Sequence, residues 1–179
     1  MRKLKKEELA RLCIEEFKAS EKTPFIVVLD NVRSMNNIGS VFRTSDAFRI
    51  EAIFLCGITA TPPHKDIYKT ALGASESVKW KYYKSTIEAI QNLKSEGYII
   101  ISVEQVEHSI LLSDFEIKER EKYAIVLGNE VKGVLQEVVD ISDYCVEIPQ
   151  FGTKHSFNIS VCCGIVLWDF FNKNHKTIK

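Results

Sequence analysis

The sequence lacks the signatures of several common protein classes. It has no G-x-x-x-x-G-K-[ST] phosphate loop and no G-x-G-x-x-G fingerprint, so nothing predicts a nucleoside triphosphatase or a nicotinamide-dependent oxidoreductase. Its five cysteines form no C-x-x-C pair and show no Cys/His ligand spacing, so we expect no metal, reduced thiols and a cytoplasmic location. No long apolar run occurs near the N-terminus, so we expect neither a secretory signal nor a membrane span.

An excess of charge of either sign is also missing. The 24 Lys and Arg residues balance the 24 Asp and Glu residues, which gives a formal net charge of zero. Any nucleic-acid binding must therefore depend on a local basic patch rather than on a global positive field. A length of 179 residues with 45% apolar residues is typical of one globular domain with a proper core.

Apolar runs alternate with amphipathic segments along the chain. Strands are predicted at residues 25–29, 52–56, 78–83, 98–103, 123–127 and 145–148. Helices are predicted from an N-cap at Asn36 or Asn37, at 67–72, at 85–95 and at 135–139, and a loop with a short helix at 104–121. This alternation predicts an α/β fold with a mainly parallel sheet and helices on both faces.

Two segments with many basic residues allow two interpretations each. Residues 2–20 have helical spacing, either as a solvated amphipathic helix or as a basic arm that contacts phosphates. We therefore divide the chain into an N-terminal helical extension, 1–22, and a main domain, 23–179. The lysines and aromatics of 78–83 indicate either a patch on which nucleic-acid bases stack or, as we favour, an edge strand whose lysines disfavour pairing with another chain.

The stretch 144–171 carries the most information. Its helix begins after an N-cap at Ser156 or Asn158 and is apolar on nearly every side over 161–171, with Asp169 its only charge. Such a helix is buried in a core, in a subunit interface or in both. The polar side chains of Ser156, Asn158 and Ser160 lie at its N-terminus, where free N–H groups favour electron-rich ligand atoms.

Three strand–loop–helix junctions are polar and contain glycine. They span residues 36–43, 128–133 and 148–160. In the first, Arg43 is either an ordinary exposed arginine or a guanidinium at the ligand-binding edge of the sheet. In the second, Gly128 permits a close approach of the backbone to a ligand, and Glu130 places a carboxylate at the mouth of the sheet.

Together these junctions resemble the three motifs of the SpoU (TrmH-like) class of SPOUT RNA methyltransferases. The first motif is NIGSVFR, from Asn37 to Arg43, and the second is LGNEVKG, from Leu127 to Gly133. The third is IPQFGTKHSFNIS, beginning at Ile148. The resemblance covers residues 25–172, and three motifs in order are far more specific than any one. It departs from the family at Gln150, where methionine is common, and at Phe157, where leucine is common.

The resemblance implies a fold, an activity and partners. Members transfer a methyl group from S-adenosylmethionine to a ribose 2′-hydroxyl of tRNA or rRNA. Their C-terminal segment forms a trefoil knot, so residues 23–179 would be a SPOUT methyltransferase domain. Members are homodimers whose active site uses both subunits, and the apolar final helix is suited to such an interface.

The resemblance also implies roles for individual residues. Arg43 would promote loss of the ribose proton, and since a guanidinium stays protonated we expect it to clamp the neighbouring phosphate. Asn37 would position Arg43 or that phosphate, Glu130 would brace the second motif or Arg43, and Asn158 would hold the third. Ser156 would belong to both the catalytic and the cofactor-binding set. The cofactor would contact Leu127, Gly128, Ile148, Gln150, Ser156 and Phe157.

Two other functions stay open at this point. One is a catalytically silent RNA-binding knot protein, and the other is a methyltransferase with a substrate that is not RNA. Plain helix capping is also a sufficient explanation for Asn158 and Ser160. The sequence does not say which RNA or which nucleotide would be modified.

Overall fold

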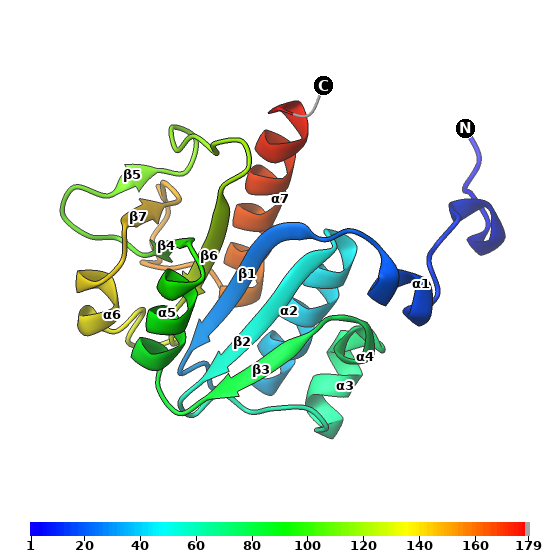
Figure 1. The fold of residues 1–179 in the computed structure, drawn as a ribbon, viewed down its shortest axis with the longest axis horizontal. Coiled ribbons are helices and arrows are strands. Elements are labelled where there is room, and N and C mark those ends of the chain that lie inside the picture. The colour runs from blue at the N-terminus through cyan, green and yellow to red at the C-terminus, as the bar shows by residue number, and fades with distance from the viewer. Residues whose placement is uncertain (178–179) are drawn as a thin grey trace.

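A seven-stranded parallel sheet forms the centre of the computed structural model, which describes residues 1–177 (Figure 1). The strand order is β3-β2-β1-β6-β4-β7-β5, and every pairing between these strands is parallel. The strands are β1 (Thr23–Asp30), β2 (Ile50–Cys56), β3 (Trp80–Tyr83), β4 (Tyr98–Val103), β5 (Ile110–Leu111), β6 (Lys122–Leu127) and β7 (Tyr144–Glu147). The predicted parallel α/β fold is confirmed, with β3 at the edge as expected.

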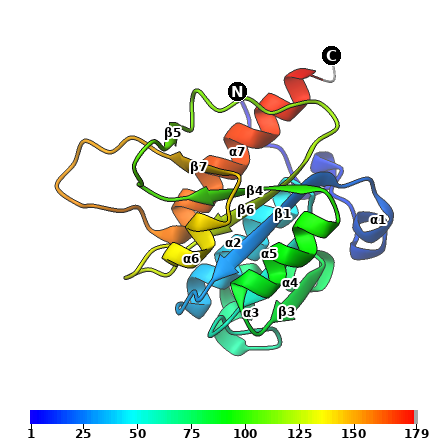
Figure 2. The same ribbon diagram turned by 60° about the vertical axis from the view of Figure 1, so that its left-hand side comes forward.

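Helices cover both faces of the sheet, as Figures 1 and 2 show. Val27 and Leu29 of β1 pack toward one layer, and Ile26 and Val28 pack toward the other, because successive side chains of a strand alternate. The first layer contains α2 (Met35–Ala47), α3 (Lys65–Ala71), α4 (Ala74–Ser77) and α7 (Ile159–Thr177). The second contains α5 (Thr86–Ser95) and α6 (Gln136–Asp140). The trefoil knot stays a prediction.

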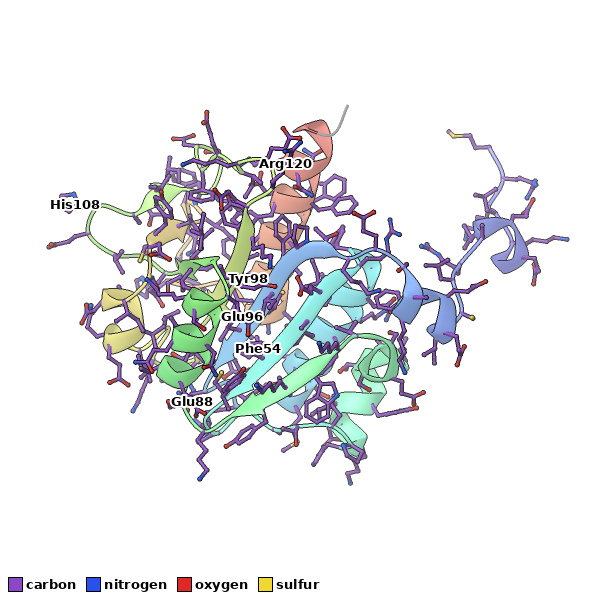
Figure 3. All side chains as sticks on the ribbon, viewed as in Figure 1. Phe54, Glu88, Glu96, Tyr98, His108 and Arg120 are labelled. Atoms are coloured by element: carbon purple, nitrogen blue, oxygen red, sulfur yellow. The ribbon has the colours of Figure 1, made fainter. Side chains whose placement is uncertain are left out.

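The second core layer also includes aromatic side chains of three strands. Phe54 of β2 packs on Tyr83 of β3, with ring centroids 4.9 Å apart. Tyr98, the first residue of β4, lies in the same layer and donates a hydrogen bond to Glu51 at 2.9 Å (Figure 3). The Tyr98 bond joins the amino-terminal ends of β2 and β4. It therefore lies at the opposite edge of the sheet from the carboxyl ends of the strands.

Helix α7 is buried on one side only. Phe170 packs edge-on against Phe25 of β1 at 5.7 Å, and Cys163 and Leu167 are fully buried. On the other side Val161 and Trp168 keep 51% and 57% of their surface exposed. The helix therefore belongs to the core of this chain, and its second face keeps apolar side chains partly exposed.

The first turns of α2 and α7 show which residues are their N-caps. Helix α2 begins earlier than expected, because Ser34 and neither Asn36 nor Asn37 is its N-cap: the Ser34 Oγ accepts the Asn37 N–H at 3.3 Å. Helix α7 starts after Asn158, whose Oδ1 accepts the N–H of Ser160 at 2.9 Å. The Asn37 side chain is thus left available for other contacts.

Two local predictions are wrong. Residues 2–20 do not form one helix but a 3-10 turn, η1 (Lys6–Leu9), and a short helix, α1 (Ile14–Ala19). Ala10 ends the first piece in a left-handed conformation with φ 44°, and Cys13 caps the second. Residues 104–121 contain β5 and turns instead of a short helix, because this segment adds an edge strand beside β7.

Residues 1–177 contain no helix that is long and apolar enough to cross a membrane. Within the same residues, no group of three or more His, Cys, Asp and Glu side chains could hold a metal ion. All five cysteines are unpaired.

Candidate functional site

A cavity of about 510 Å³ opens at the carboxyl edge of the sheet. Two segments supply most of its wall: the second loop, residues 128–135 between β6 and α6, and the third loop, residues 148–158 between β7 and α7. Figure 2 shows the third loop standing out from the body of the molecule. Every residue predicted to contact a cofactor lines this cavity: Leu127, Gly128, Ile148, Gln150, Ser156 and Phe157.

The second loop folds back on itself in a tight hairpin. Asn129 and Gly133 exchange both backbone hydrogen bonds at 2.9 Å. A Cβ on Gly128 would overlap the backbone of Gly133 and Val134, so only glycine lets the loop close. The Asn129 side chain completes the turn, since its Oδ1 accepts the N–H groups of Val131 and Lys132 at 2.9 and 3.1 Å.

Glu130 joins the second loop to the first loop, residues 31–34 between β1 and α2. Its carboxylate accepts the backbone N–H groups of Arg33 and Ser34 at 3.0 and 2.9 Å. The Asn37 side-chain amide donates to the same carboxylate at 3.1 Å. Partial burial alone raises the pKa of Glu130, but these hydrogen bonds outweigh it and hold the pKa below its ordinary value.

Asn37 extends this connection to the third loop. Its Oδ1 accepts a hydrogen bond from the Asn158 Nδ2 at 3.2 Å. Asn158 in turn accepts from the hydroxyl of Ser160 at 2.7 Å as well as from the backbone. Glu130, Asn37 and Asn158 therefore form one hydrogen-bonded chain that ties the second and third loops to the start of α2, and Glu130 adds the first loop to it. The chain has one residue from each of the three sequence motifs.

Arg43 lies apart from this chain of hydrogen bonds. It projects from α2, is exposed and is absent from the wall of the cavity in its own chain. Within residues 1–177 it forms no hydrogen bond or ion pair, so Asn37 and Glu130 contact each other and not Arg43. Glu130, Ser156 and Asn158 line the cavity, whereas Asn37 reaches it through its two partners.

Asp30 supports the second loop from outside the three motifs, and the sequence analysis did not identify it. It is fully buried at the end of β1, where its carboxylate accepts from Thr86 at 2.5 Å, from the Asn31 side chain at 2.8 Å and from the Leu135 N–H at 2.9 Å. It therefore anchors the far end of the second loop. A carboxylate directly after a fully apolar strand was the available signal.

Glu104 and Gln105, which follow β4, were also missed. Both line the cavity, together with Glu147 and Cys162. Burial, and to a smaller extent the nearby Glu104 charge, raises the pKa of the Cys162 thiol to about 11, so it stays protonated near neutral pH. A polar segment after a strand gave no specific signal for Glu104 or Gln105.

Residues 24–168 match the model of the SpoU rRNA methylase family. A Borreliella burgdorferi protein described as an uncharacterized tRNA/rRNA methyltransferase is 30% identical over 156 residues, which cover 87% of this chain and 67% of that protein. A Staphylococcus haemolyticus protein assigned to the TrmH family of tRNA/rRNA methyltransferases is 25% identical over 166 residues, covering 91% and 64%. This chain thus spans about two thirds of the length of these curated relatives.

Solved structures have the same fold. The TrmH/SpoU tRNA modifying enzyme of A. aeolicus superposes with a TM-score of 0.81 at 22% identity, covering 92% of this chain and 83% of that one. The AdoMet-bound rRNA methyltransferase of Sinorhizobium meliloti gives 0.79 at 23% identity, covering 87% and 59%. At these identities the likeness shows the fold.

Proposed function

This chain belongs to the SpoU rRNA methylase family, and from that premise we propose that it transfers a methyl group from S-adenosylmethionine to a ribose 2′-hydroxyl of tRNA or rRNA. The observation that carries the proposal is the hydrogen-bonded chain of Glu130, Asn37 and Asn158, which joins three loops beside one cavity. A silent RNA-binding protein would not need to hold these loops together around a pocket of this size.

The cavity suits the proposed cofactor in size and in chemistry. Its volume of about 510 Å³ lies within the roughly 300–1,000 Å³ of ordinary ligand sites. Leu127, Ile148 and Phe157 offer apolar contacts for an adenine ring, and Glu147 offers a carboxylate for a positively charged ligand. The bound cofactor would supply an activated methyl group on a sulfonium.

The residues of this chain would then select and orient the ribose. Glu130 and Asn37 keep the first loop against the second, and Asn158 keeps the third in register with both. A loop system held in this way costs no reorganisation when the substrate arrives. The Arg43 guanidinium would clamp the phosphate beside the target and favour loss of the ribose proton by its charge.

Arg43 would do this in the site of a second subunit. Helices α2 and α7 pack side by side, with the rings of Phe48 and Trp168 6.1 Å apart. A homodimer that covers the apolar face of α7 would bury Val161 and Trp168 and bring Arg43 toward the loops of the partner. Such a dimer explains why Arg43 lies outside the cavity of its own chain.

Calorimetry with S-adenosylmethionine, followed by mass spectrometry of RNA treated with the protein, tests the proposal. We expect the protein to bind the cofactor and to place a methyl group on ribose. If the cofactor carries a labelled methyl group, ribonuclease should release that label from the product, because the product is RNA. Arg43→Ala should bind the cofactor as the wild type does and lose at least about 100-fold in transfer, whereas Lys69→Ala, an exposed cation on α3, should keep full activity. No cofactor binding, or a label that survives ribonuclease, would contradict the proposal.

A further inference from the structure

The segment directly after β4 contacts both cavity loops, although it lies outside the three motifs. The backbone of Glu104 donates to the carbonyl of Val146 at 3.0 Å, which fixes the segment to β7. From this fixed point the two adjacent side chains reach in different directions. Glu104 contacts the second loop and Gln105 contacts the third.

Glu104 closes the second loop at its far end. Its Oε2 accepts the N–H of Val134 at 2.9 Å, and its Oε1 accepts the N–H of Gln105 at 3.0 Å. Val134 is the residue whose backbone lies against Gly128, so the carboxylate holds the end of the loop over its beginning. Both oxygens are used by backbone donors, which fixes the carboxylate as well as the loop.

Gly133 makes room for this carboxylate. A Cβ at that position would overlap the Glu104 Oε2, and the backbone has φ +68°, which glycine adopts without strain. The last glycine of the LGNEVKG motif is therefore matched to an acidic side chain in the segment directly after β4. In this chain the close fit between the second loop and β4 depends on both residues.

Gln105 makes the equivalent contact with the third loop. Its side-chain amide donates to the backbone carbonyl of His155 at 3.1 Å. The third loop projects from the body and is exposed over residues 151–158, so this bond holds a segment that has little packing of its own (Figure 2). Its acceptor residue, His155, lines the same cavity as Glu104.

We infer that Glu104 and Gln105 are positioning residues that set the separation of the second and third loops, and with it the affinity for the cofactor. The inference rests on the proposed function for the identity of the ligand. The claim that Glu104 holds the second loop and Gln105 holds the third depends only on the hydrogen bonds. Neither residue needs to touch the reacting atoms.

The first measurement is amide hydrogen exchange on the purified, ligand-free protein, read peptide by peptide. Glu104→Ala should speed exchange over 129–135 and leave 150–157 unchanged, and Gln105→Ala should do the reverse. A general loss of stability would speed both peptides together and would count against the inference. Equal exchange in wild type and both variants would also overturn it, whether or not the protein binds S-adenosylmethionine.

The second measurement is calorimetry with S-adenosylmethionine. Glu104→Ala should weaken binding on the order of tenfold, Gln105→Ala about threefold, and Glu104→Gln by an intermediate amount, because the amide nitrogen that replaces one carboxylate oxygen is a donor and cannot accept an N–H. The control is Glu107→Gln, an exposed residue next to His108 in the same segment, and Figure 3 shows His108 at the outer edge of the molecule.

These results separate two failures. If the wild-type protein does not bind the cofactor, the proposed function fails, and the exchange data alone decide the positioning role. If the wild type binds and Glu104→Ala binds equally well, the positioning role fails and the proposed function survives. In a turnover assay the variants should raise the KM for the cofactor more than they lower kcat, since the residues act on binding geometry.

Discussion

The two halves of the sheet share an apolar core but differ in the loops at their carboxyl ends. On the β1–β2–β3 side, strands and helices alternate, and side chains such as Phe42 and Ile53 are fully buried between them. On the β6–β4–β7 side, the strands end in irregular loops that side chains hold. Asn129 and Glu104 accept backbone N–H groups of the second loop, and Glu130 of that loop accepts backbone N–H groups of the first loop, after β1. Apolar burial stabilises both halves, since Ile100 and Ile125 are as fully buried as Ile53, and the second half adds a site shaped by polar contacts.

Removing apolar volume from the first half should produce the largest effect, and it should be an effect on stability. Phe42→Ala on α2 deletes a fully buried ring, and we expect a loss of about 3–5 kcal/mol in the free energy of unfolding. Urea titration measures this loss. Cofactor affinity of the fraction that stays folded should change less than about twofold, and a larger change would break the proposed division of roles.

Removing the central carboxylate of the second half should instead affect activity. Glu130→Gln keeps the size of the side chain but cannot accept from Arg33, Ser34 and Asn37 together. We expect methyl transfer to fall about 100-fold while the free energy of unfolding changes by less than about 1 kcal/mol. Glu137→Gln on α6, also exposed, is the matched control. Unfolding of the Glu130→Gln variant at ordinary temperature would show that the polar chain is structural.

Two glycines in the cavity loops sharpen the comparison further. Gly128→Ala forces the second loop open, because the added methyl would overlap the backbone of Gly133 and Val134. We expect S-adenosylmethionine to bind about tenfold more weakly. Gly152→Ala in the third loop meets nothing within 4 Å and should bind as the wild type does. Equal affinities for the two variants would mean that closure of the second loop does not matter for binding.

The smallest effect should be a dependence on acid pH. The folded protein holds the pKa of Glu130 below its ordinary value of 4.5, so the carboxylate contributes stability above that value and loses it as pH falls through the folded pKa. The stability difference between wild type and Glu130→Gln should therefore shrink below pH 4.5. Unfolding curves at about pH 7 and at progressively lower pH measure it. A difference that grows on acidification would reverse the assigned sign.

The contrast between the apolar core and the polar loops also explains which parts of the structure could be predicted from the sequence. Apolar runs and helical spacing identify the strands around Phe25, Ile53 and Tyr123 and the two helical layers, because burial imposes a period on the chain. Local competition between polar groups is harder to predict. Ser34 caps α2 although Asn36 and Asn37 follow it, and Ala10 interrupts an otherwise helical pattern.

At the site, the sequence motifs predict which loops form the cavity, but they do not include every residue that fixes those loops in place. Glu130, Asn37 and Asn158 stand inside motifs, and the structure brings them into contact. Asp30, Glu104 and Gln105 stand outside them, and their partners are distant in sequence, so no local pattern indicates the contacts. The predicted knot comes from family resemblance, since periodicity carries no information about threading. For the dimer the sequence adds one sign, the helix that is apolar on nearly every side over 161–171.

The most direct test of the central claim is to mix two impaired variants. In the proposed dimer, the cofactor lies in the loops of one chain, and Arg43 of the other chain lies beside it. Arg43→Ala and Glu130→Gln subunits, unfolded and refolded together, should recover about a quarter of wild-type methyl transfer, because random pairing gives half mixed dimers with one intact site each. Activity no higher than the mean of the two separate variants would contradict a site shared between subunits.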